Sequence, residues 1–388
     1  MATMVQAVRL ALHVGEARHG VTDVFGEDVG PPLGGVFTAT QGLETTWNSP
    51  LDERGVIGTA MGLALAGQRP VCEIQFCDYA FNVIDLLKLA GAMYWSSNGD
   101  WNCPLVMMTP VGSGIHGSIY HSHSFDGQAT RIPGWKIVMP STPLDTYGLL
   151  LSAIVDPNPV MVLLPKALMR VKAAPGELIP GEPEDERALG RMIDAPLGDR
   201  SAWRPEWPET RDLFIPIGKL KTVRAGRDLT VVTYGRMVAL CDKVARDLAG
   251  EGVEAEVIDL RSLQPYDWDG LAESVGRTGR LLVVNEDTEV TNFGEHLIRR
   301  VAEELFDALV APPRLLAGKN VPGIGLADNL ERASVPQQED IHGAMRALVR
   351  TRVSRGATNG AAPARSTNRF SIADVDARDA LSRAYAGR

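Results

Sequence analysis

The sequence predicts an α/β protein built of two doubly wound domains. Short apolar runs of strand length alternate with helical patterns along almost the whole chain, which favours parallel sheets covered by helices. A chain of 388 residues is also too long for one ordinary hydrophobic core. A proline-rich and acidic stretch divides the pattern. We therefore expect domains at 1–171 and 213–350, a linker or insertion at 172–212, and a flexible tail at 351–388.

The composition excludes several classes of function. Lys and Arg total 39 against 48 Asp and Glu, a net charge of −9, so neither a nucleic acid nor a membrane surface is an expected partner. No apolar run reaches the roughly 18 residues of a membrane span. The four cysteines form no CxxC pair, which fits a reducing compartment. Arg supplies 31 of the 39 basic residues, which is typical of a GC-rich bacterial genome. Together with the cysteine usage, this leads us to expect a bacterial protein of the cytoplasm.

The first domain begins with a helical pattern. Val5, Val8 and Leu12 recur at the spacing of an amphipathic helix within residues 1–20, which lack the apolar block of a signal peptide. Alternating patterns then predict five strands and two helices. The strands are expected at 21–25, 70–76, 105–109, 135–139 and 160–164, and the helices at 54–67 and 79–94.

The run Ser49-Pro50-Leu51-Asp52 predicts how the helix at 54–67 begins. Ser49 is expected as the N-cap with Pro50 at the first helical position, while Asp52 returns the capping hydrogen bond. The helix itself is rich in Gly and Ala, which indicates that another element packs very close to it.

The linker at 172–212 holds six prolines and ten acidic residues, and Trp203 and Trp207 are candidates to anchor it on a folded surface. A second α/β unit follows. Its strands are expected at 229–234, 254–260 and 280–285, and its helices at 237–249, 295–309 and 341–349. The tail carries a weak helical pattern from Asp374.

The glycine-rich loop at 111–124 contains a possible nucleotide motif. Residues 112–117 spell GxGxxG after a strand, which is the signature of dinucleotide binding. That signature has to open a helix and requires an acidic residue at the end of the next strand, and neither is present. We therefore interpret these glycines as positions of close approach in an active-site loop.

The same loop gathers three of the seven histidines, His116, His121 and His123. A zinc site is one hypothesis, but the loop has no nearby Cys and only Asp126 as a carboxylate ligand. Histidines that exchange protons or contact a substrate are the favoured interpretation.

Two further residues admit both a structural and a catalytic explanation. Glu53 lies in the first turn of a helix, where acids are common because they interact favourably with the positive end of the helix dipole. Cys77 beside Asp78 suggests a nucleophile, but the sequence places no base near it, so we predict a buried thiol. Taken alone, both residues favour the structural explanation.

Several runs of residues occur in matching order in one known family. They are Gly26-Glu27-Asp28-Val29-Gly30, Gly34-Gly35-Val36-Phe37, Glu73-Ile74-Gln75-Phe76-Cys77-Asp78-Tyr79, Ile115-His116-Gly117, Tyr120-His121-Ser122, Pro140-Ser141-Thr142-Pro143, Asp156-Pro157-Asn158-Pro159-Val160, and the segments 229–235 and 257–261. With these motifs the chain resembles the β subunit of the thiamine-diphosphate-dependent E1 component of 2-oxoacid dehydrogenase complexes (pyruvate, branched-chain and acetoin types). The resemblance extends over about residues 5–350.

The resemblance implies a thiamine-diphosphate pyrimidine-binding domain followed by a transketolase C-terminal domain. It also implies a set of cofactor contacts. Glu53 would bond N1′ of the cofactor's aminopyrimidine, Tyr79 would stack on that ring, and Gln75 and Leu51 would line its pocket.

Two further sets of residues follow from the same resemblance. His121 would be the active-site histidine of the family's HSQ motif, with His116 and His123 beside it in the loop that meets the substrate or acceptor. A possible potassium site would be formed by Asp156 and Asn158, together with Ala153 and the carbonyl of Leu105.

The chemistry of thiamine explains why a glutamate is expected at position 53. The cofactor reacts through a weak carbon acid, and its own 4′-imino group is the base, which forms only if a carboxyl group partners N1′. Burial among small apolar residues would raise the pKa of Glu53 and let it share this proton. A histidine in a glycine-rich loop can position protons as a lipoyl disulfide opens.

The sequence also departs from the family pattern. The segment at 42–50 is shorter than usual, the HSQ motif reads His121-Ser122-His123, the linker is longer and more acidic, and the tail is extra. These departures bear on the substrate and the acceptor rather than on the basic chemistry. The Gly-Asp-Gly motif that binds the cofactor diphosphate through Mg²⁺ is missing, so this half of the site is expected on a separate α subunit in an α2β2 heterotetramer.

We therefore predict the β subunit of a two-chain enzyme that oxidatively decarboxylates a small 2-oxo acid and transfers the acyl group to lipoyl on an E2 protein. A stand-alone two-chain thiamine enzyme of specialised metabolism, with a carrier protein or a second carbonyl as acceptor, is the second hypothesis. A catalytically silent partner that stabilises an α subunit is the third. Intact Glu53, Tyr79 and His121 count against the last.

Overall fold

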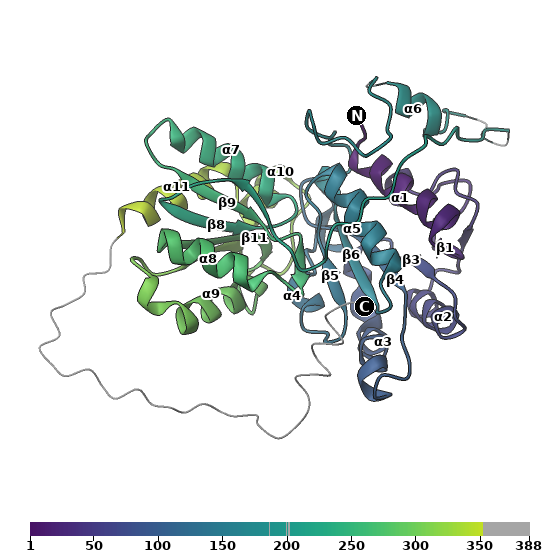
Figure 1. Cartoon of the computed structure of the whole chain (residues 1–388), viewed down its shortest axis with the longest axis horizontal. Coiled ribbons are helices and arrows are strands. Elements are labelled where there is room, and N and C mark those ends of the chain that lie inside the picture. Colours follow the sequence, from purple (N-terminus) through teal and green to yellow (C-terminus); the bar gives the residue numbers. More distant parts are fainter. Residues whose placement is uncertain (186, 199, 201, 352–388) are drawn as a thin grey trace, which may run out of the picture.

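The computed structural model describes residues 1–185, 187–198, 200 and 202–351. Two sheets of mainly parallel strands lie side by side, each with helices on both faces (Figure 1). This arrangement confirms the predicted α/β class. The predicted flexible tail, including the weak helix from residue 374, lies outside the described residues apart from Thr351. In the described part of the chain, no helix combines the length and the apolar character required to cross a membrane.

The first sheet has seven strands in the order β10-β5-β6-β4-β3-β1-β2. Every neighbouring pair is parallel except β10 and β5, which are antiparallel. The strands are β1 (Asp23–Gly26), β2 (Thr46–Asn48), β3 (Pro70–Glu73), β4 (Val106–Val111), β5 (Lys136–Val138), β6 (Val160–Pro165) and β10 (Ser262–Gln264). Since β10 comes from the second half of the chain, the edge of this sheet joins the two halves.

Helices cover the first sheet on two faces. Helices α1 (Met4–Arg18) and α5 (Pro143–Val155) share one core cluster, and α2 (Glu53–Leu65) and α3 (Ile84–Ser96) share the other. Side chains of a strand alternate between the two: in β4, Val106 and Met108 belong to the first cluster and Met107 to the second. The continuous apolar runs of the sequence therefore mark strands buried on both faces.

Helix α1 is buried on nearly all sides, although its sequence predicts an amphipathic helix. The difference arises because described residues between 172 and 212 fold back over it and share its core cluster, among them Ile179, Leu189 and Ile193. Arg9 is 1% exposed, and its guanidinium donates hydrogen bonds to the Ile193 carbonyl and to Asp194 Oδ1, 2.8 Å away. Burial lowers the pKa of Arg9 despite the Asp194 carboxylate. A short helix, α6 (Ala188–Ile193), belongs to this covering segment.

The two tryptophans of the covering segment contact the first domain as predicted. Trp207 stacks on His13 with ring centroids 4.0 Å apart. Trp203 lies so close to Gly42 that a Cβ at this glycine would be 3.1 Å from its ring. Both tryptophans therefore attach the acidic stretch to the first domain.

The predicted N-cap of α2, Ser49, is wrong by three residues. Asp52 is the N-cap, and its side chain accepts a hydrogen bond from the Arg54 N–H at 3.1 Å. Ser49 instead continues the strand β2 alongside β1: its N–H donates to the Gly26 carbonyl at 2.8 Å, and its hydroxyl donates to the Pro50 carbonyl at 3.0 Å. Pro50 accordingly precedes the helix instead of opening it.

The second sheet has five strands in the order β12-β11-β8-β9-β7, with β7 antiparallel to β9. They are β7 (Lys221–Arg224), β8 (Leu229–Thr233), β9 (Ala255–Asp259), β11 (Leu281–Thr288) and β12 (Arg314–Gly318). Helices α7 (Met237–Ala249) and α11 (Gln338–Arg350) pack on one face, and α8 (Trp268–Thr278) and α9 (Phe293–Glu304) on the other. Helix α10 (Asp328–Ser334) lies between β12 and α11 in the chain.

Short helical turns complete the structure. The predicted helix at 79–94 is divided into a 3₁₀ segment, Cys77–Val83, followed by α3. The helix predicted at 295–309 ends at Glu304, and the turn Phe306–Ala308 follows it. The remaining short elements are the 3₁₀ turns Val36–Thr38, Ser118–Tyr120 and Lys166–Leu168 and the helix α4 (Asp126–Ala129).

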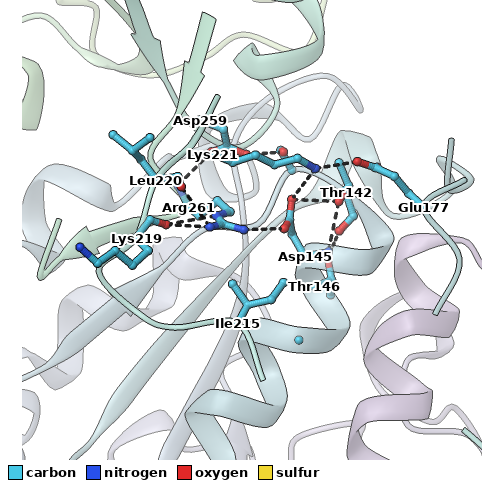
Figure 2. A network of polar contacts seen from close by, with 12 residues as sticks. Thr142, Asp145, Thr146, Glu177, Ile215, Lys219, Leu220, Lys221, Asp259 and Arg261 are labelled. Atoms are coloured by element: carbon cyan, nitrogen blue, oxygen red, sulfur yellow. Dashed lines mark hydrogen bonds and ion pairs between the residues drawn. The ribbon is translucent and has the colours of Figure 1, made fainter. Parts of the chain in front are cut away.

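A polar network joins the domains and the covering segment at the start of α5 (Figure 2). Asp145 accepts a hydrogen bond from Arg261 at 3.1 Å and lies 3.6 Å from the Lys221 ammonium. Lys221 also bonds Glu177 of the covering segment at 2.6 Å. Asp259 is fully buried beside them, and burial raises its pKa to about 7. This contact and the shared strand β10 fix the second domain against the first.

Candidate active site

The predicted cofactor-binding and histidine-loop residues lie beyond the carboxyl ends of the parallel strands of the first sheet. Strand β1 ends at Gly26 and leads into Glu27, β3 ends at Glu73 and leads towards Gln75, and β4 ends at Val111 and leads into the loop at 112–124. Ligand sites of open α/β sheets occur at this edge. The sheet topology therefore collects three segments that are far apart in the sequence.

Glu53 is the first residue of α2. Its Oε2 accepts a hydrogen bond from Asn82 Nδ2 at 3.0 Å, and the neighbouring Arg54 makes a bidentate pair with Asp85 at 2.7 and 2.8 Å. These contacts fix the first turn of α2 against the 3₁₀ segment before α3. The Glu53 side chain is only half-buried, so the described residues do not supply the apolar enclosure expected around it.

Glu27 is a second carboxylate at this place, and sequence reasoning gave it no role. It is 8% exposed, and its Oε1 has no hydrogen-bond partner among the described residues. Burial raises the pKa of Glu27, and the charge of Glu53 raises it further. A buried acceptor without a donor is costly in a protein, which points to a ligand that brings one.

Gln75 and Leu51 lie in different settings. Gln75 Nε2 donates a hydrogen bond to Asp28 Oδ2 at 2.7 Å, which ties the segment after β3 to the segment after β1. Leu51 is 85% exposed just before α2. The structure thus brings Gln75 into contact with the Asp28 carboxylate, whereas the Leu51 side chain is exposed.

Tyr79 and His121 form a hydrogen-bonded pair. The Tyr79 hydroxyl lies 3.0 Å from His121 Nε2, and His121 Nδ1 lies 3.2 Å from the Gly117 carbonyl. Because a carbonyl can only accept, Nδ1 carries the hydrogen in the neutral ring and Nε2 accepts from Tyr79. The edge of the Phe76 ring holds the imidazole in place, with centroids 4.3 Å apart.

Tyr79 also connects this pair electrostatically to the carboxylates. Burial raises the pKa of Tyr79, and the charges of Asp78, Glu27 and Glu53 raise it further. The hydroxyl therefore keeps its proton and remains a donor to His121. The stacking on a pyrimidine that the resemblance implies stays a prediction.

The second domain holds the glycine-rich loop from the other side. Glu331 of α10 accepts hydrogen bonds from the Gly114 N–H at 2.8 Å and from the His116 N–H at 2.9 Å. Glu286 of β11 accepts one from the Ser113 hydroxyl at 2.6 Å and another from Arg236 at 2.7 Å. Two carboxylates of one domain thus fix the backbone of a loop that belongs to the other.

The glycines of this loop are required by the contact. Gly112 and Gly114 have φ of +84° and +98°, and a Cβ at Gly112 would lie 2.7 Å from Glu286 Oε2. The loop leads into a three-residue 3₁₀ turn instead of the helix that dinucleotide binding requires. The interpretation as glycines of close approach is therefore confirmed.

The three histidines point to different partners. His116 has a half-exposed side chain 3.6 Å from Glu331, while His123 lies 3.3 Å from Gln128 and against the Phe81 ring. Over the described ranges no three His, Cys, Asp or Glu side chains come together as a metal site would require. Among the described residues, the structure thus gives the zinc hypothesis no ligand group.

Cys77 is buried, as predicted. Its Sγ lies 3.1 Å from the His123 carbonyl, to which it donates, and burial raises the pKa of the thiol well above its usual value. A thiol in this state is a poor nucleophile. The residue supports the loop and takes no part in bond formation.

Comparison with known proteins assigns both domains. Residues 1–172 match the family described as transketolase, pyrimidine binding domain, and residues 218–341 match transketolase, C-terminal domain. The chain is 34% identical to the 2-oxoisovalerate dehydrogenase subunit beta of Bacillus subtilis over 89% of this chain and 97% of that one. It is 36% identical to the pyruvate dehydrogenase E1 component subunit beta of the same organism, over 80% and 87%.

The chain belongs to the family of 2-oxoacid dehydrogenase E1 β subunits. A relative in Pseudomonas aeruginosa, also named 2-oxoisovalerate dehydrogenase subunit beta, is 36% identical over 82% of this chain and 88% of that one. A solved structure titled split gene transketolase, inactive beta4 tetramer, has the same fold, with a TM-score of 0.65 at 18% identity over 90% of this chain and 99% of that chain. The family resemblance and the transketolase-like fold inferred from the motifs are thereby confirmed.

The potassium site implied by the resemblance to this family lies apart from the loop, at the end of α5. Asp156 Oδ1 accepts from the Asn158 N–H at 2.9 Å, and Asp156 Oδ2 lies 2.5 Å from the Lys136 ammonium. The Leu105 carbonyl accepts from the Val160 N–H, and the Ala153 carbonyl from the Asp156 N–H. Each of these carbonyls accepts one hydrogen bond and keeps a second lone pair, so the potassium site stays a prediction.

Sequence reasoning missed the groups that complete the β subunit's site from a distance. Glu286 and Glu331 lie more than 160 positions from the loop they hold, and no local pattern marks them. Glu27 could have been noticed, because it stands in a quoted motif directly after a buried strand. Asn82, the partner of Glu53, lies in a 3₁₀ segment that the helical pattern concealed.

Proposed function

We propose that this chain is the β subunit of a two-chain thiamine-diphosphate-dependent enzyme that oxidatively decarboxylates a small 2-oxo acid and transfers the acyl group to lipoyl on an E2 protein. The observation that carries the proposal is the buried Glu27 carboxylate with an unpartnered oxygen, beside half-buried Glu53 and the Tyr79–His121 pair. Relatives that share most of the chain are named pyruvate and 2-oxoisovalerate dehydrogenase β subunits.

The carboxylates fit an aminopyrimidine, which presents ring nitrogen and amino groups that hydrogen-bond to carboxyl groups. Glu53, positioned by Asn82, would hold a proton against the ring nitrogen N1′. Glu27 would satisfy its free oxygen with a donor of the ligand. When bound, thiamine diphosphate supplies the electron sink that decarboxylation of a 2-oxo acid requires.

The Tyr79–His121 pair is suited to proton transfer. Since Nδ1–H of His121 is held by the Gly117 carbonyl, proton exchange takes place at Nε2. Tyr79 donates to that nitrogen and keeps the ring oriented until a substrate or acceptor displaces the hydroxyl. His116 and His123, which flank this ring in the loop, would contact the substrate or the acceptor.

The outer face of α2 supports a partner chain. The Gly- and Ala-rich sequence predicts close packing there, yet a Cβ at Gly58 or Gly62 would meet no atom within 4 Å. Large apolar side chains of α2, of α3 and of the residue pair before α2 are exposed: Leu65, Leu89, Trp95 and Leu51. Because contiguous exposed apolar surface marks interaction sites, we assign this face to an α subunit that packs against the glycines of α2.

The α subunit would complete the site at the open end of α2. It would enclose Glu53 and bring the Mg²⁺ and diphosphate contacts, for which this sequence carries no Gly-Asp-Gly motif. An α2β2 heterotetramer follows by analogy with the family. The described part of the chain has four free, buried cysteines, which suits the reducing cytoplasm of a bacterium.

The test is turnover of the chain co-expressed with a candidate α subunit, with pyruvate and branched-chain 2-oxo acids as substrates and an artificial electron acceptor. We expect thiamine-dependent turnover that Glu53→Gln reduces by about 10³-fold or more, because an amide cannot hold the proton. Full activity of Glu53→Gln, or no turnover of any 2-oxo acid, would contradict the proposal. Addition of a lipoyl domain then distinguishes E2-dependent acyl transfer from a stand-alone enzyme with another acceptor.

A further inference from the structure

Two carboxyl groups from different domains meet in the interior, just after the glycine-rich loop. Asp126 is the first residue of α4 and belongs to the first domain, whereas Asp287 lies on β11 of the second. Asp126 is 0% exposed and Asp287 is 3% exposed. Burial of two carboxylates side by side is costly unless a cation pairs with them or one of them loses its charge.

The contacts around this pair join the two domains. The Gly127 N–H, next to Asp126 in the chain, donates to Asp287 Oδ2 at 3.0 Å. A Cβ at position 127 would lie 2.5 Å from this oxygen, so only glycine lets the carboxyl group come so close to the backbone. From the second domain, the Tyr234 hydroxyl donates to Asp126 Oδ2. The start of α4 is therefore fixed by one acceptor and one donor of the other domain.

The pair requires a proton. Asp126 Oδ1 is buried and makes no hydrogen bond among the described residues. Burial, followed by the charge of Asp287, raises the pKa of Asp126 to about 8, and burial also raises the pKa of Asp287. The polar groups of Tyr234 and Ser124 favour the charged form of Asp126 but do not offset these effects. The two carboxyl groups are within hydrogen-bonding reach of each other, and two ionised carboxylates have no hydrogen to share.

The other titratable groups beside the pair keep one charge state near neutral pH. Burial raises the pKa of Tyr234 and of the Cys77 thiol well above their usual values, so both stay protonated. Arg131 follows α4 and favours the charged form of Asp287, and its guanidinium is always charged. A change of charge at this contact therefore falls on the carboxyl pair itself.

We propose that Asp126 and Asp287 share one proton, and that this proton holds the end of the glycine-rich loop against the second domain. With the proton present, an O–H···O bond joins the two carboxyl groups and the Gly127 contact is kept. When the proton leaves, two buried like charges face each other and the contact opens. A fall in pH thus tightens the loop that carries His121 and a rise loosens it, whichever substrate or acceptor the enzyme uses.

Proton linkage fixes the sign and the range of this effect. In the closed contact the pair keeps its proton up to about pH 8, whereas a hydrated aspartate in the opened contact loses it near pH 4. Between these values the closed contact binds one proton more than the open one. The equilibrium constant for closing therefore falls by up to about tenfold for each pH unit, and it becomes constant above about pH 8.

Hydrogen exchange at the Gly127 amide of the unaltered full chain tests this, with each rate divided by that of an unstructured chain at the same pH. We expect its protection to fall by on the order of 10- to 100-fold between pH 6 and pH 8. Asp259→Asn is the control, since Asp259 is buried at another contact between the domains, and it should show the same fall. Protection of Gly127 that does not change with pH in the unaltered chain overturns the proposal.

Asp126→Asn and Asp287→Asn are reciprocal variants that replace the shared proton by a permanent donor. An amide at either position can donate to the remaining carboxylate at any pH, so the protection of Gly127 should lose its pH dependence in both. A pH-dependent fall equal to that of the unaltered chain in either variant overturns the proposal.

A measurement without any substitution decides the case if these variants do not fold. In the unaltered chain, with aspartate labelled by ¹³C at the side-chain carboxyl, we expect a carboxyl signal that titrates at about pH 8. The absence of any aspartate signal that moves above about pH 7.5 overturns the proposal, because both carboxyl groups are then ionised at lower pH.

Discussion

The two halves of the candidate site differ in how far this chain completes them. In the His121 half, both ring nitrogens have partners, Phe76 packs on the ring, and the loop backbone is bonded to Glu331 of the second domain. In the Glu53 half, Glu27 has an unpartnered buried oxygen, Glu53 is half-buried, and Leu51 is exposed.

The difference indicates which half of the site this chain orders without a partner. Hydrogen bonds within the chain order the histidine loop, since a carboxylate from one domain binds the backbone of the other. The glutamate half retains an orphan acceptor and exposed apolar side chains, both of which cost free energy in an isolated chain and are relieved by a partner. We infer that the partner subunit and the cofactor complete the Glu53 half and change the His121 half little.

The largest effect is expected from a large side chain on the partner face. Gly58→Leu should abolish binding of the α subunit and lower turnover more than 100-fold, because its Cβ points into the space assigned to the partner. The matched control is Gly343→Leu on α11, which also has no atom within 4 Å of its Cβ. Both changes raise helix propensity by up to about 1 kcal/mol, so both variants should fold. Co-purification of Gly58→Leu with the α subunit at wild-type yield would refute the assignment.

His121→Ala should have the next largest effect. Removal of the group that exchanges protons should lower turnover by on the order of 10² to 10³-fold, with binding of the α subunit unchanged. His123→Ala is the comparison, since this ring contacts Gln128 and Phe81 instead of Tyr79. An equal loss in the two variants would show that the loop, and not the His121–Tyr79 pair, is what matters.

Glu331→Gln tests how the second domain orders the loop. The amide oxygen can replace only part of a carboxylate that accepts two backbone N–H groups. We expect hydrogen exchange at the Gly114 and His116 amides to become about 10-fold faster, because charge-assisted bonds are worth about 1.5–3 kcal/mol. Unchanged exchange at these amides would mean that other contacts hold the loop.

Asp259→Asn should affect turnover least and change only the pH dependence of stability. Burial raises the pKa of Asp259 to about 7, against about 3.9 in the unfolded chain. Between these values the folded state keeps a proton that the unfolded state has lost, so the free energy of unfolding falls as the pH rises from about 4 to about 7, by at most about 1.4 kcal/mol per pH unit. Above pH 7 the contribution is flat. Urea unfolding from pH 5 to pH 8 should show this slope in the wild type and a weaker one in Asp259→Asn; parallel curves would contradict it.

Much of the fold could be predicted, because buried parallel strands leave continuous apolar runs. The strands at 105–109 and 160–164 correspond to β4 and β6, and both are buried along their whole length. Elements whose sequence is shaped by tertiary contacts could not be predicted in the same way. Strand β10 is three residues long and joins the other domain's sheet, and α5 carries apolar residues almost all round because α1 covers it.

The site was predictable where family motifs carry it and not where distant residues complete it. Tyr79 and His121 stand in quoted motifs, and the structure brings them into contact. Lys136, by contrast, has no local feature that links it to Asp156, which lies 20 residues further on; the contact exists only because β5 and β6 are neighbours. The wrong helix cap at Ser49 has the same origin, a strand contact invisible to a local capping rule.

The most direct test of the central claim is a titration of the purified chain with the purified α subunit, in the presence of thiamine diphosphate and Mg²⁺. The chain alone should show no turnover of a 2-oxo acid, and activity should rise with added α subunit and saturate at one α chain for each chain of this protein. Turnover by the chain alone at the rate of the mixture would contradict the claim that this protein supplies only half of a thiamine site.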